Sequence, residues 1–157
     1  MADLRQISLL LLFLLYGCSR ISDLTPDALR TAQAQWEKTG PASYRMVVET
    51  SGDRMEKSKY EVTVKAKSVV KLVRNGTPLQ PEAGDNSYTV EGLFRTMDQE
   101  IDLKGKPHLL GAPPGYSSYP MASFDRATGR LLRFQRSVGG TKNNIEINVR
   151  EFEILDQ

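Results

Sequence analysis

The alternation of apolar and polar residues along the chain predicts six β-strands. In residues 59–66 the apolar side chains fall on even positions and the polar ones on odd positions, as in a strand with one buried face. The same reasoning places strands at residues 44–50, 69–73, 121–124, 131–134 and 145–154. Asn75-Gly76 and residues 125–129 contain the residue types that favour tight turns. Strands that follow one another are therefore expected to pair antiparallel.

The last predicted strand changes parity along its length. Its apolar positions are odd-numbered as far as Val149 and even-numbered from Phe152 onward. Such a change indicates either a β-bulge near Arg150-Glu151 or a change in the face that the strand buries. The sequence leaves both alternatives open.

Helical periodicity with clear end signals predicts a first helix over residues 26–39. Thr25 is a suitable N-cap, Pro26 fits the first helical position, and the charge of Asp27 favours the positive end of the helix. Gly40-Pro41 ends the helix. Its apolar face consists of Leu29, Ala32 and Trp36.

A second helix is predicted after Thr89, which serves as its N-cap. Its apolar face consists of Val90, Leu93, Phe94, Met97 and Ile101. Outside that face lie Glu91, Arg95, Asp98 and Glu100. Because Asp98, Glu100 and Asp102 are spaced by two, they fan around the helix and are interpreted as a solvated surface rather than a carboxylate site.

The predicted order is helix, three strands, helix, three strands. A polar loop is expected at residues 78–87, and a Pro- and Gly-rich irregular stretch at residues 104–120. Tight turns join the strands, and the regular alternation of helix and parallel strand is missing. The chain is therefore predicted to be α+β, an antiparallel sheet with two helices packed on one face.

The N-terminus has the layout of an export signal. Arg5 precedes ten mostly apolar residues at positions 7–16, and Gly17 ends that run. A helix that crosses a bilayer needs roughly 20 apolar residues, so a permanent transmembrane segment is not expected. An ordinary secretory signal followed by an incidental cysteine is one interpretation of this segment.

Leu15-Tyr16-Gly17-Cys18 resembles the bacterial lipobox. The resemblance implies cleavage between Gly17 and Cys18 and lipidation of the Cys18 thiol. Cys18 is the only cysteine, so the chain forms no internal disulfide. The expected organisation is a lipoprotein signal peptide over residues 1–17, a lipidated linker over residues 18–24, and a single α+β domain over residues 25–157.

Length and charge narrow the class of protein. Removal of residues 1–17 would leave 140 of the 157 residues, which is enough for one core without disulfides. The net charge is +2, which is too small to argue for nucleic acid as a partner. Ser19 follows the cysteine, and by resemblance to lipoprotein sorting it favours the outer membrane in a bacterium with two membranes.

Short motifs over most of the predicted domain resemble one known family. They are Trp36, Ser43-Tyr44-Arg45, Asn75-Gly76, Thr89-Val90 with Leu93-Phe94, Tyr119-Pro120 and Asp125. This pattern is similar to a family of bacterial lipoproteins known as the domain of unknown function six-one-seven-four. Ser118 stands where that family usually has Gly before Tyr-Pro. The resemblance implies a fold and no activity.

Little in the sequence points to catalysis. His108 is the only histidine, and one His without further cysteines gives no zinc site of familiar spacing. A hydrolase that combines His108 with Ser117 or Ser118 and Asp125 is an alternative, but no nucleophile elbow frames either serine. No Gly-rich phosphate loop is present. We therefore predict no catalytic residue, no metal site and no cofactor.

Four lysines define a candidate charged surface. Lys57, Lys59, Lys65 and Lys67 share odd parity, so they are predicted to project from one face of a strand. One interpretation is contact with anionic lipid head groups or with an acidic partner. The alternative is a solvated sheet face that discourages edge-to-edge association.

The segment of residues 106–119 defines a candidate interaction loop. It carries Tyr116 and Tyr119, and Pro120 follows directly. Long loops are often functional, and Tyr is a frequent anchor of protein interfaces. The alternative is that Tyr119 and Pro120 pack under the sheet.

Together these features predict a lipid-anchored protein of the cell envelope that faces the periplasm or the cell exterior. Its domain is expected to bind another protein or an envelope component without enzymatic activity. A carrier of a small ligand or lipid is the first alternative, and it requires a concave apolar pocket. A hydrolase that uses His108 is the second.

Overall fold

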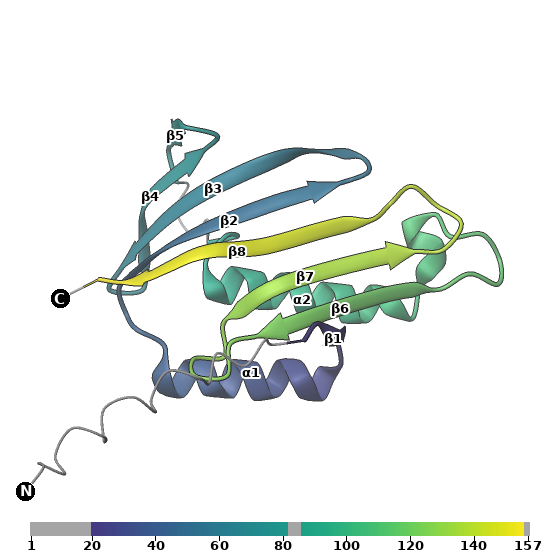
Figure 1. Cartoon of the computed structure of the whole chain (residues 1–157), viewed down its shortest axis with the longest axis horizontal. Coiled ribbons are helices and arrows are strands. Elements are labelled where there is room, and N and C mark those ends of the chain that lie inside the picture. The colour runs from purple at the N-terminus through teal and green to yellow at the C-terminus, as the bar shows by residue number, and fades with distance from the viewer. Residues whose placement is uncertain (1–19, 82–85, 156–157) are drawn as a thin grey trace, which may run out of the picture.

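The structure, a computed structural model, describes residues 20–81 and 86–155 (Figure 1). The described residues form one antiparallel sheet of eight strands, two α-helices and a short 3-10 helix. The predicted α+β class, with an antiparallel sheet and two helices, is confirmed. The predicted signal peptide, with Gly17 and Cys18, lies outside the described residues.

The sheet contains two strands that the hydrophobic pattern did not predict. Its spatial order is β1-β6-β7-β8-β2-β3-β4-β5. The strands are β1 (Ser22–Asp23), β2 (Tyr44–Gly52), β3 (Met55–Lys65), β4 (Ser68–Arg74), β5 (Thr77–Leu79), β6 (Ser118–Phe124), β7 (Leu131–Val138) and β8 (Ile145–Ile154). The predicted order is therefore wrong. One strand precedes the first helix, four lie between the helices, and three follow.

The two missed strands form the edges of the sheet. β1 has two residues and lies in the predicted linker, and β5 has three residues and lies in the predicted polar loop. Segments this short have no measurable period, and only pairing with a neighbour makes them strands. Leu24, directly after β1, is 1% exposed and donates its backbone N–H to Pro120 O at 2.9 Å. The folded domain thus includes Ser22, whereas the sequence predicts that it starts at residue 25.

Helix α1 (Pro26–Thr39) begins and ends where the sequence predicts. The Thr25 hydroxyl accepts a hydrogen bond from Ala28 N at 3.2 Å, and Gly40 caps the other end. The predicted apolar face is buried. The side of α1 that carries Ala32 contacts the turn after β6, where Gly129 allows close approach.

Helix α2 (Val90–Lys104) is also capped as predicted, since Thr89 Oγ1 accepts from Gly92 N at 3.0 Å. It contacts β6 and β7, whereas α1 contacts α2. In Figure 1, α2 runs behind the sheet and α1 runs along the side on which β6 lies. Both helices contribute to a single hydrophobic core, but only α2 packs broadly against the strands. The predicted packing of both helices on one face is thus accurate only in part.

The parity change in β8 is a bulge. Val47 of β2 pairs with Glu151, and the next residue, Val48, pairs with Val149, so Arg150 is the extra residue. The bulge predicted near Arg150-Glu151 is confirmed. It turns Phe152 toward the core, where its ring centroid lies 5.2 Å from that of Tyr44.

The end of β3 differs from the prediction. Ala66 was expected to continue the strand, but Ala66 and Lys67 have φ angles of 47° and 65° and connect β3 to β4. Two consecutive residues with positive φ form the tight turn that suits the twist of a hairpin. Lys67 therefore lies in a turn and not on the face of a strand.

One carboxylate joins three elements of the fold. Trp36 Nε1 of α1 donates to Glu91 Oε1 of α2 at 2.8 Å, and the Tyr44 hydroxyl of β2 donates to Glu91 Oε2 at 3.3 Å. The same hydroxyl accepts from Val90 N at 3.1 Å. Burial raises the pKa of Tyr44 far above its usual value, so the hydroxyl keeps its proton as a donor.

Two glycines allow a matched test of the contact between α1 and the β6–β7 turn. Gly129 and Gly76 have φ angles of +81° and +82°, but a Cβ at Gly129 would lie 2.1 Å from Ala32 O, and one at Gly76 meets nothing within 4 Å. We expect Gly76→Ala to lower the free energy of unfolding by about 1 kcal/mol, from backbone strain alone. Gly129→Ala adds a steric clash and should cost about 3 kcal/mol or more. Urea unfolding followed by Trp36 fluorescence measures both, and equal losses would contradict the close contact.

Candidate functional site

The predicted interaction loop is shorter than expected, because β6 already begins at Ser118. Tyr119 and Pro120 therefore lie in a strand. Pro120 is buried, whereas Tyr119 is 57% exposed and Tyr116 in the preceding loop is 52% exposed. Neither alternative holds for the whole segment, because Pro120 is buried whereas both tyrosines face solvent.

The loop before β6 is held in place by neighbouring turns. A Cβ at Gly139 would lie 2.7 Å from the Tyr116 ring, and Gly139 N donates to Ser117 O at 3.0 Å. The 3-10 helix η1 (Pro107–Leu110) precedes the loop, and its Leu109 is 62% exposed. Leu109, Tyr116 and Tyr119 are exposed at the end of the sheet where β6 begins and β7 ends, which we call the loop end (Figure 1).

A buried ion pair lies behind the loop end. Arg136 Nη1 of β7 donates to Glu100 Oε1 of α2 at 2.8 Å, and each side chain is 7% exposed. Arg136 Nη2 also donates to the backbone and side-chain oxygens of Asn143 at 3.1 and 3.0 Å. Asn143 in turn donates to Leu110 O at 3.0 Å. This chain of hydrogen bonds connects α2 and β7 to η1.

The burial of Glu100 contradicts the prediction that the acidic residues of α2 all lie on a solvated surface. It was expected on the exposed surface, but it follows Met97 by three residues and therefore shares its buried face. Arg136 is two residues from buried Phe134 and two from buried Val138, so it lies on the buried face of β7. Burial raises the pKa of the Glu100 carboxyl above its ordinary value, and the Arg136 guanidinium partly offsets this effect.

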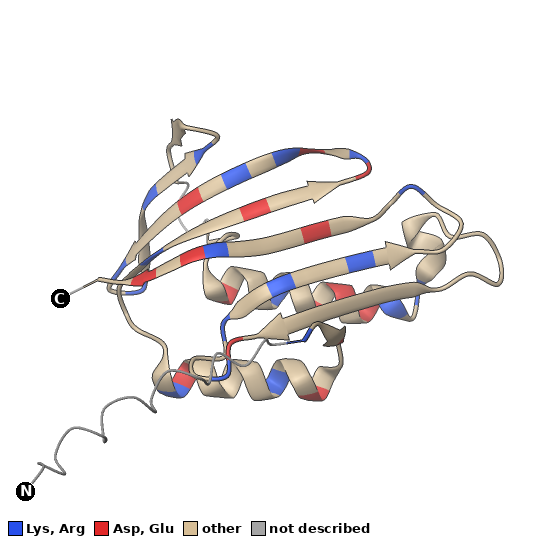
Figure 2. Cartoon of the chain, viewed as in Figure 1, with Lys and Arg blue, Asp and Glu red and all other residues tan. Residues whose placement is uncertain are grey.

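The four predicted lysines do not form one cationic stripe. Lys57 Nζ lies 3.7 Å from Glu49 Oε2, and Lys59 Nζ lies 3.5 Å from Glu61 Oε1. Figure 2 shows positive and negative residues interspersed along the strands of this face. Lys65 and Lys67 stand apart, because neither forms an ion pair within residues 20–81 and 86–155. The predicted stripe therefore divides into a paired half and an unpaired half.

The residues proposed for a hydrolase are not brought together. His108 is exposed on η1, and its ring makes no hydrogen bond to any described residue. Asp125 accepts hydrogen bonds from Thr128 at the far end of β6. Seven residues of extended strand, about 23 Å, separate Ser118 from Asp125. The described part of the chain also contains no group of three or more residues suited to hold a metal ion.

A cleft of about 730 Å³ lies between α1 and the end of β6. Ala28, Ala32 and Phe124 give it apolar walls, while Asp27 and Arg126 are among its charged residues. The cleft is open to solvent and mixed in polarity, unlike an enclosed apolar pocket.

The register of β1 fixes the direction in which the chain enters the sheet. Ser22 pairs with Ala122 and Asp23 pairs with Met121, antiparallel to β6. Arg20 and Ile21 therefore approach from the side of the β6–β7 turn, opposite to the loop end. Among the described residues, no helix has the length and apolar character needed to cross a membrane.

Comparison with known proteins identifies one relationship. A family described as a family of unknown function (DUF6174) matches residues 28–106, which include Trp36, Tyr44 and Glu91. The matched segment ends before Tyr116 and Tyr119. No curated protein matches the chain. The resemblance inferred from the sequence motifs is thus confirmed at the level of the family.

The buried ion pair predicts a specific pattern of mutant stabilities. Arg136→Leu leaves the Glu100 carboxylate buried and unpaired, so it should lower the free energy of unfolding by about 3–5 kcal/mol. Replacing both residues with Leu removes both charges, and we expect the double variant to be more stable than either single one. Urea unfolding at neutral pH measures all three variants. A double variant that loses the sum of the single effects would contradict the coupling.

Proposed function

Because the chain belongs to a family of unknown function, DUF6174, we propose its function from the residues and their geometry. The protein is a lipid-anchored lipoprotein of the bacterial cell envelope. Its domain acts as a non-enzymatic interaction module that binds another protein through the loop end. The domain faces the periplasm or the cell exterior, and the anchor lies in the outer membrane where a bacterium has two.

The lipid anchor is supported by the sequence before the fold. The apolar run at residues 7–16 contains Leu15 and is followed by Gly17 and Cys18, at the spacing of a lipobox. β1 begins at Ser22, so only three residues separate Cys18 from the sheet. The resulting tether spans at most about 14 Å between the Cα atoms of Cys18 and Ser22. Such a tether keeps the domain close to the membrane.

The observation that carries the binding proposal is the placement of exposed apolar residues. Three of the seven large apolar residues that are exposed in the described chain, Leu109, Tyr116 and Tyr119, lie at the loop end. Single exposed apolar residues are ordinary, but a group with two tyrosines is typical of protein interfaces. The antiparallel register of β1 points this end away from the tether. A partner can therefore reach it without approaching the bilayer.

A small-ligand carrier is the second candidate, and the cleft beside α1 favours it. A volume of about 730 Å³ is in the range of small-molecule sites. Its mixed lining would suit a polar ligand better than a lipid. Ala28→Tyr would fill this cleft and leave the loop end unchanged, so the two candidates respond to different variants.

The anchor is tested by the fate of Cys18. In a bacterial host, we expect the N-terminal peptide of the mature protein to begin at Cys18 and to carry the mass of a lipid modification. Cys18→Ser should abolish labelling with palmitate and release the protein from the membrane fraction, because the Ser hydroxyl does not replace the thiol in this modification. Ser19→Ala serves as the control. A mature chain that begins elsewhere, or an unmodified Cys18, would contradict the anchor.

The interaction surface is tested by site-specific crosslinking in cells. A photoreactive amino acid at Tyr116 or Tyr119 should give a discrete adduct with a protein, and the same group at Val70 or Ile154 should not. The purified partner should then bind Leu109→Ser/Tyr116→Ser/Tyr119→Ser about tenfold more weakly or worse. The matched control, Val70→Ser/Leu79→Ser/Ile154→Ser, removes three exposed apolar residues elsewhere and should bind normally. Equal losses in both triple variants would contradict the assignment of this surface.

A further inference from the structure

One end of the domain is built from three turns, and one of them, the β6–β7 turn, lies on the side from which Arg20 and Ile21 approach β1. The last turn of α1 contacts the β6–β7 turn, since Gln35 Nε2 and Thr39 Oγ1 both donate to Ala127 O, at 2.7 and 3.2 Å. The β3–β4 turn contacts the segment after α1 through Lys67 N and Ala42 O at 2.8 Å. We call these three turns together the anchor end. Figure 1 shows it at the opposite side of the molecule from the loop end.

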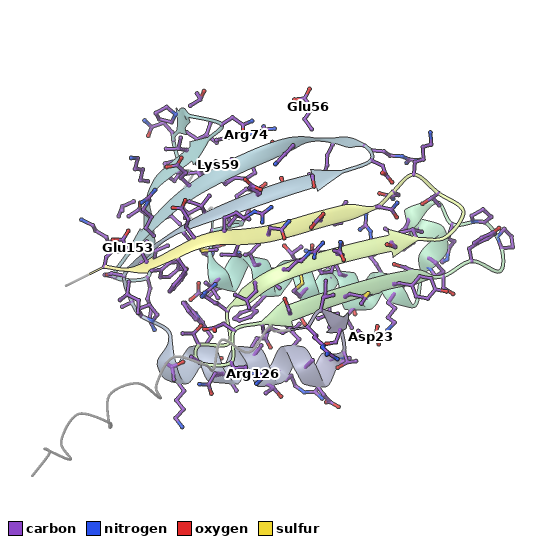
Figure 3. The ribbon with its side chains drawn as sticks, viewed as in Figure 1. Asp23, Glu56, Lys59, Arg74, Arg126 and Glu153 are labelled. Carbon is purple, nitrogen blue, oxygen red and sulfur yellow. The ribbon has the colours of Figure 1, made fainter. Side chains whose placement is uncertain are left out.

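The anchor end carries an excess of exposed, unpaired positive charge. Lys38 lies in the last turn of α1, and Lys65 ends β3. Lys67 lies in the β3–β4 turn, and Arg126 lies in the β6–β7 turn, where Figure 3 shows it beside α1. All four are exposed, and none forms an ion pair with another described residue.

The acidic residues at the anchor end do not balance this charge. Glu153 of β8 lies 3.7 Å from Arg45, which also lies 3.8 Å from Glu61 and from Glu151. Asp125 accepts two hydrogen bonds from Thr128. Among the described residues, these four cations together with Arg45 and Arg130 face four carboxylates, those of Glu37, Asp125, Glu151 and Glu153, so the described part of the anchor end is net positive.

Some other exposed cations have acidic neighbours, whereas Lys71, Lys106 and Lys142 are also exposed and form no ion pair with a described residue. Lys57 and Lys59 are paired with Glu49 and Glu61 on the outer face of the sheet. In the β2–β3 hairpin, Arg54 is two residues from Glu56. The anchor end differs in that four such cations lie on turns that contact one another, which the net charge of +2 does not predict.

We infer that the anchor end rests on a surface of anionic lipid head groups and so fixes how the domain stands on its membrane. This inference rests on the proposed lipid anchor. A tether of at most about 14 Å holds Ser22, which pairs with Ala122 of β6, close to the head groups, and an orientation with the anchor end down brings the four cations to the same surface. Each basic residue near an anionic surface strengthens association by about fivefold. Exposed Ile154, at the same end, adds an apolar contact.

An acidic protein would present the same charge but meets a geometric obstacle. The tether leaves little space between the anchor end and the bilayer for a folded domain, which is typically a few tens of ångströms wide. Acylation of Cys18 itself brings the domain to the lipid surface, so this contact needs no further partner. The orientation that results turns Tyr116 and Tyr119 away from the membrane.

Amide hydrogen exchange on vesicles tests the inference. The lipidated protein, purified from membranes in detergent, is inserted into vesicles of phosphatidylcholine with or without phosphatidylglycerol. We expect exchange at residues 126–128 and 66–68 to slow severalfold when phosphatidylglycerol is present, because head groups cover these turns. Exchange at residues 53–54, in the hairpin at the far end of β3, should be unchanged.

Two variants of equal net charge separate local contact from overall charge. The first carries Lys38→Gln, Lys65→Gln, Lys67→Gln and Arg126→Gln, and it should lose the protection. The second carries Arg54→Gln, Lys71→Gln, Lys106→Gln and Lys142→Gln, four exposed cations outside the anchor end, and it should keep the protection. Because all eight side chains are exposed, both variants are expected to fold, which circular dichroism checks.

The outcomes distinguish this inference from the proposed function. A lipidated protein whose exchange is the same on both kinds of vesicle, or a protection that both variants lose equally, would overturn the orientation and leave the anchor intact. A mature protein without lipid on Cys18, shown by the mass of its N-terminal peptide, would overturn the anchor and the inference with it.

Discussion

The carboxylate of Glu91 is the point at which the layers of this protein are joined. It accepts one hydrogen bond from Trp36 of α1 and one from Tyr44 of β2, while its own backbone belongs to the first turn of α2. Two buried aromatic side chains thereby satisfy their only polar atoms and fix the angle between helix and sheet. Phe152 completes the cluster, since the bulge at Arg150 brings its ring against Tyr44. All of these contacts are long-range in sequence.

A second constraint is the pairing of β1 with β6, which determines from which end of the domain the chain enters the sheet. Two residues of edge strand place Arg20 and Ile21, which precede them, on the side of the β6–β7 turn. The exposed tyrosines then lie at one end, and the four cations of the anchor end lie at the other. The proposed roles of the two ends, protein contact and lipid contact, both depend on this register, because a parallel pairing would reverse the position of the tether.

The charged residues of this fold serve different purposes according to their surroundings. On the outer face of the sheet, ion pairs such as Lys57 with Glu49 are solvated and contribute little to stability. The pair of Glu100 and Arg136 is buried, and its hydrogen bonds to Asn143 hold η1 against the sheet. The cations of the anchor end belong to neither class, since they are exposed and unpaired. Residue type alone does not distinguish these three settings.

The sequence by itself determined the elements whose signals are local. Both helix caps and the Asn75-Gly76 turn follow from residue types and periodicity over a few positions, whereas the parity change near Arg150 left two alternatives that the pairing of β8 with β2 decided in favour of a bulge. Tertiary structure decided what depends on partners distant in the chain. β1 and β5 are too short to show a period, and Lys67 left the predicted stripe because its turn requires a positive φ. Glu100 is buried because Arg136, 36 residues away, supplies the opposite charge, and only the fold brings that partner within reach.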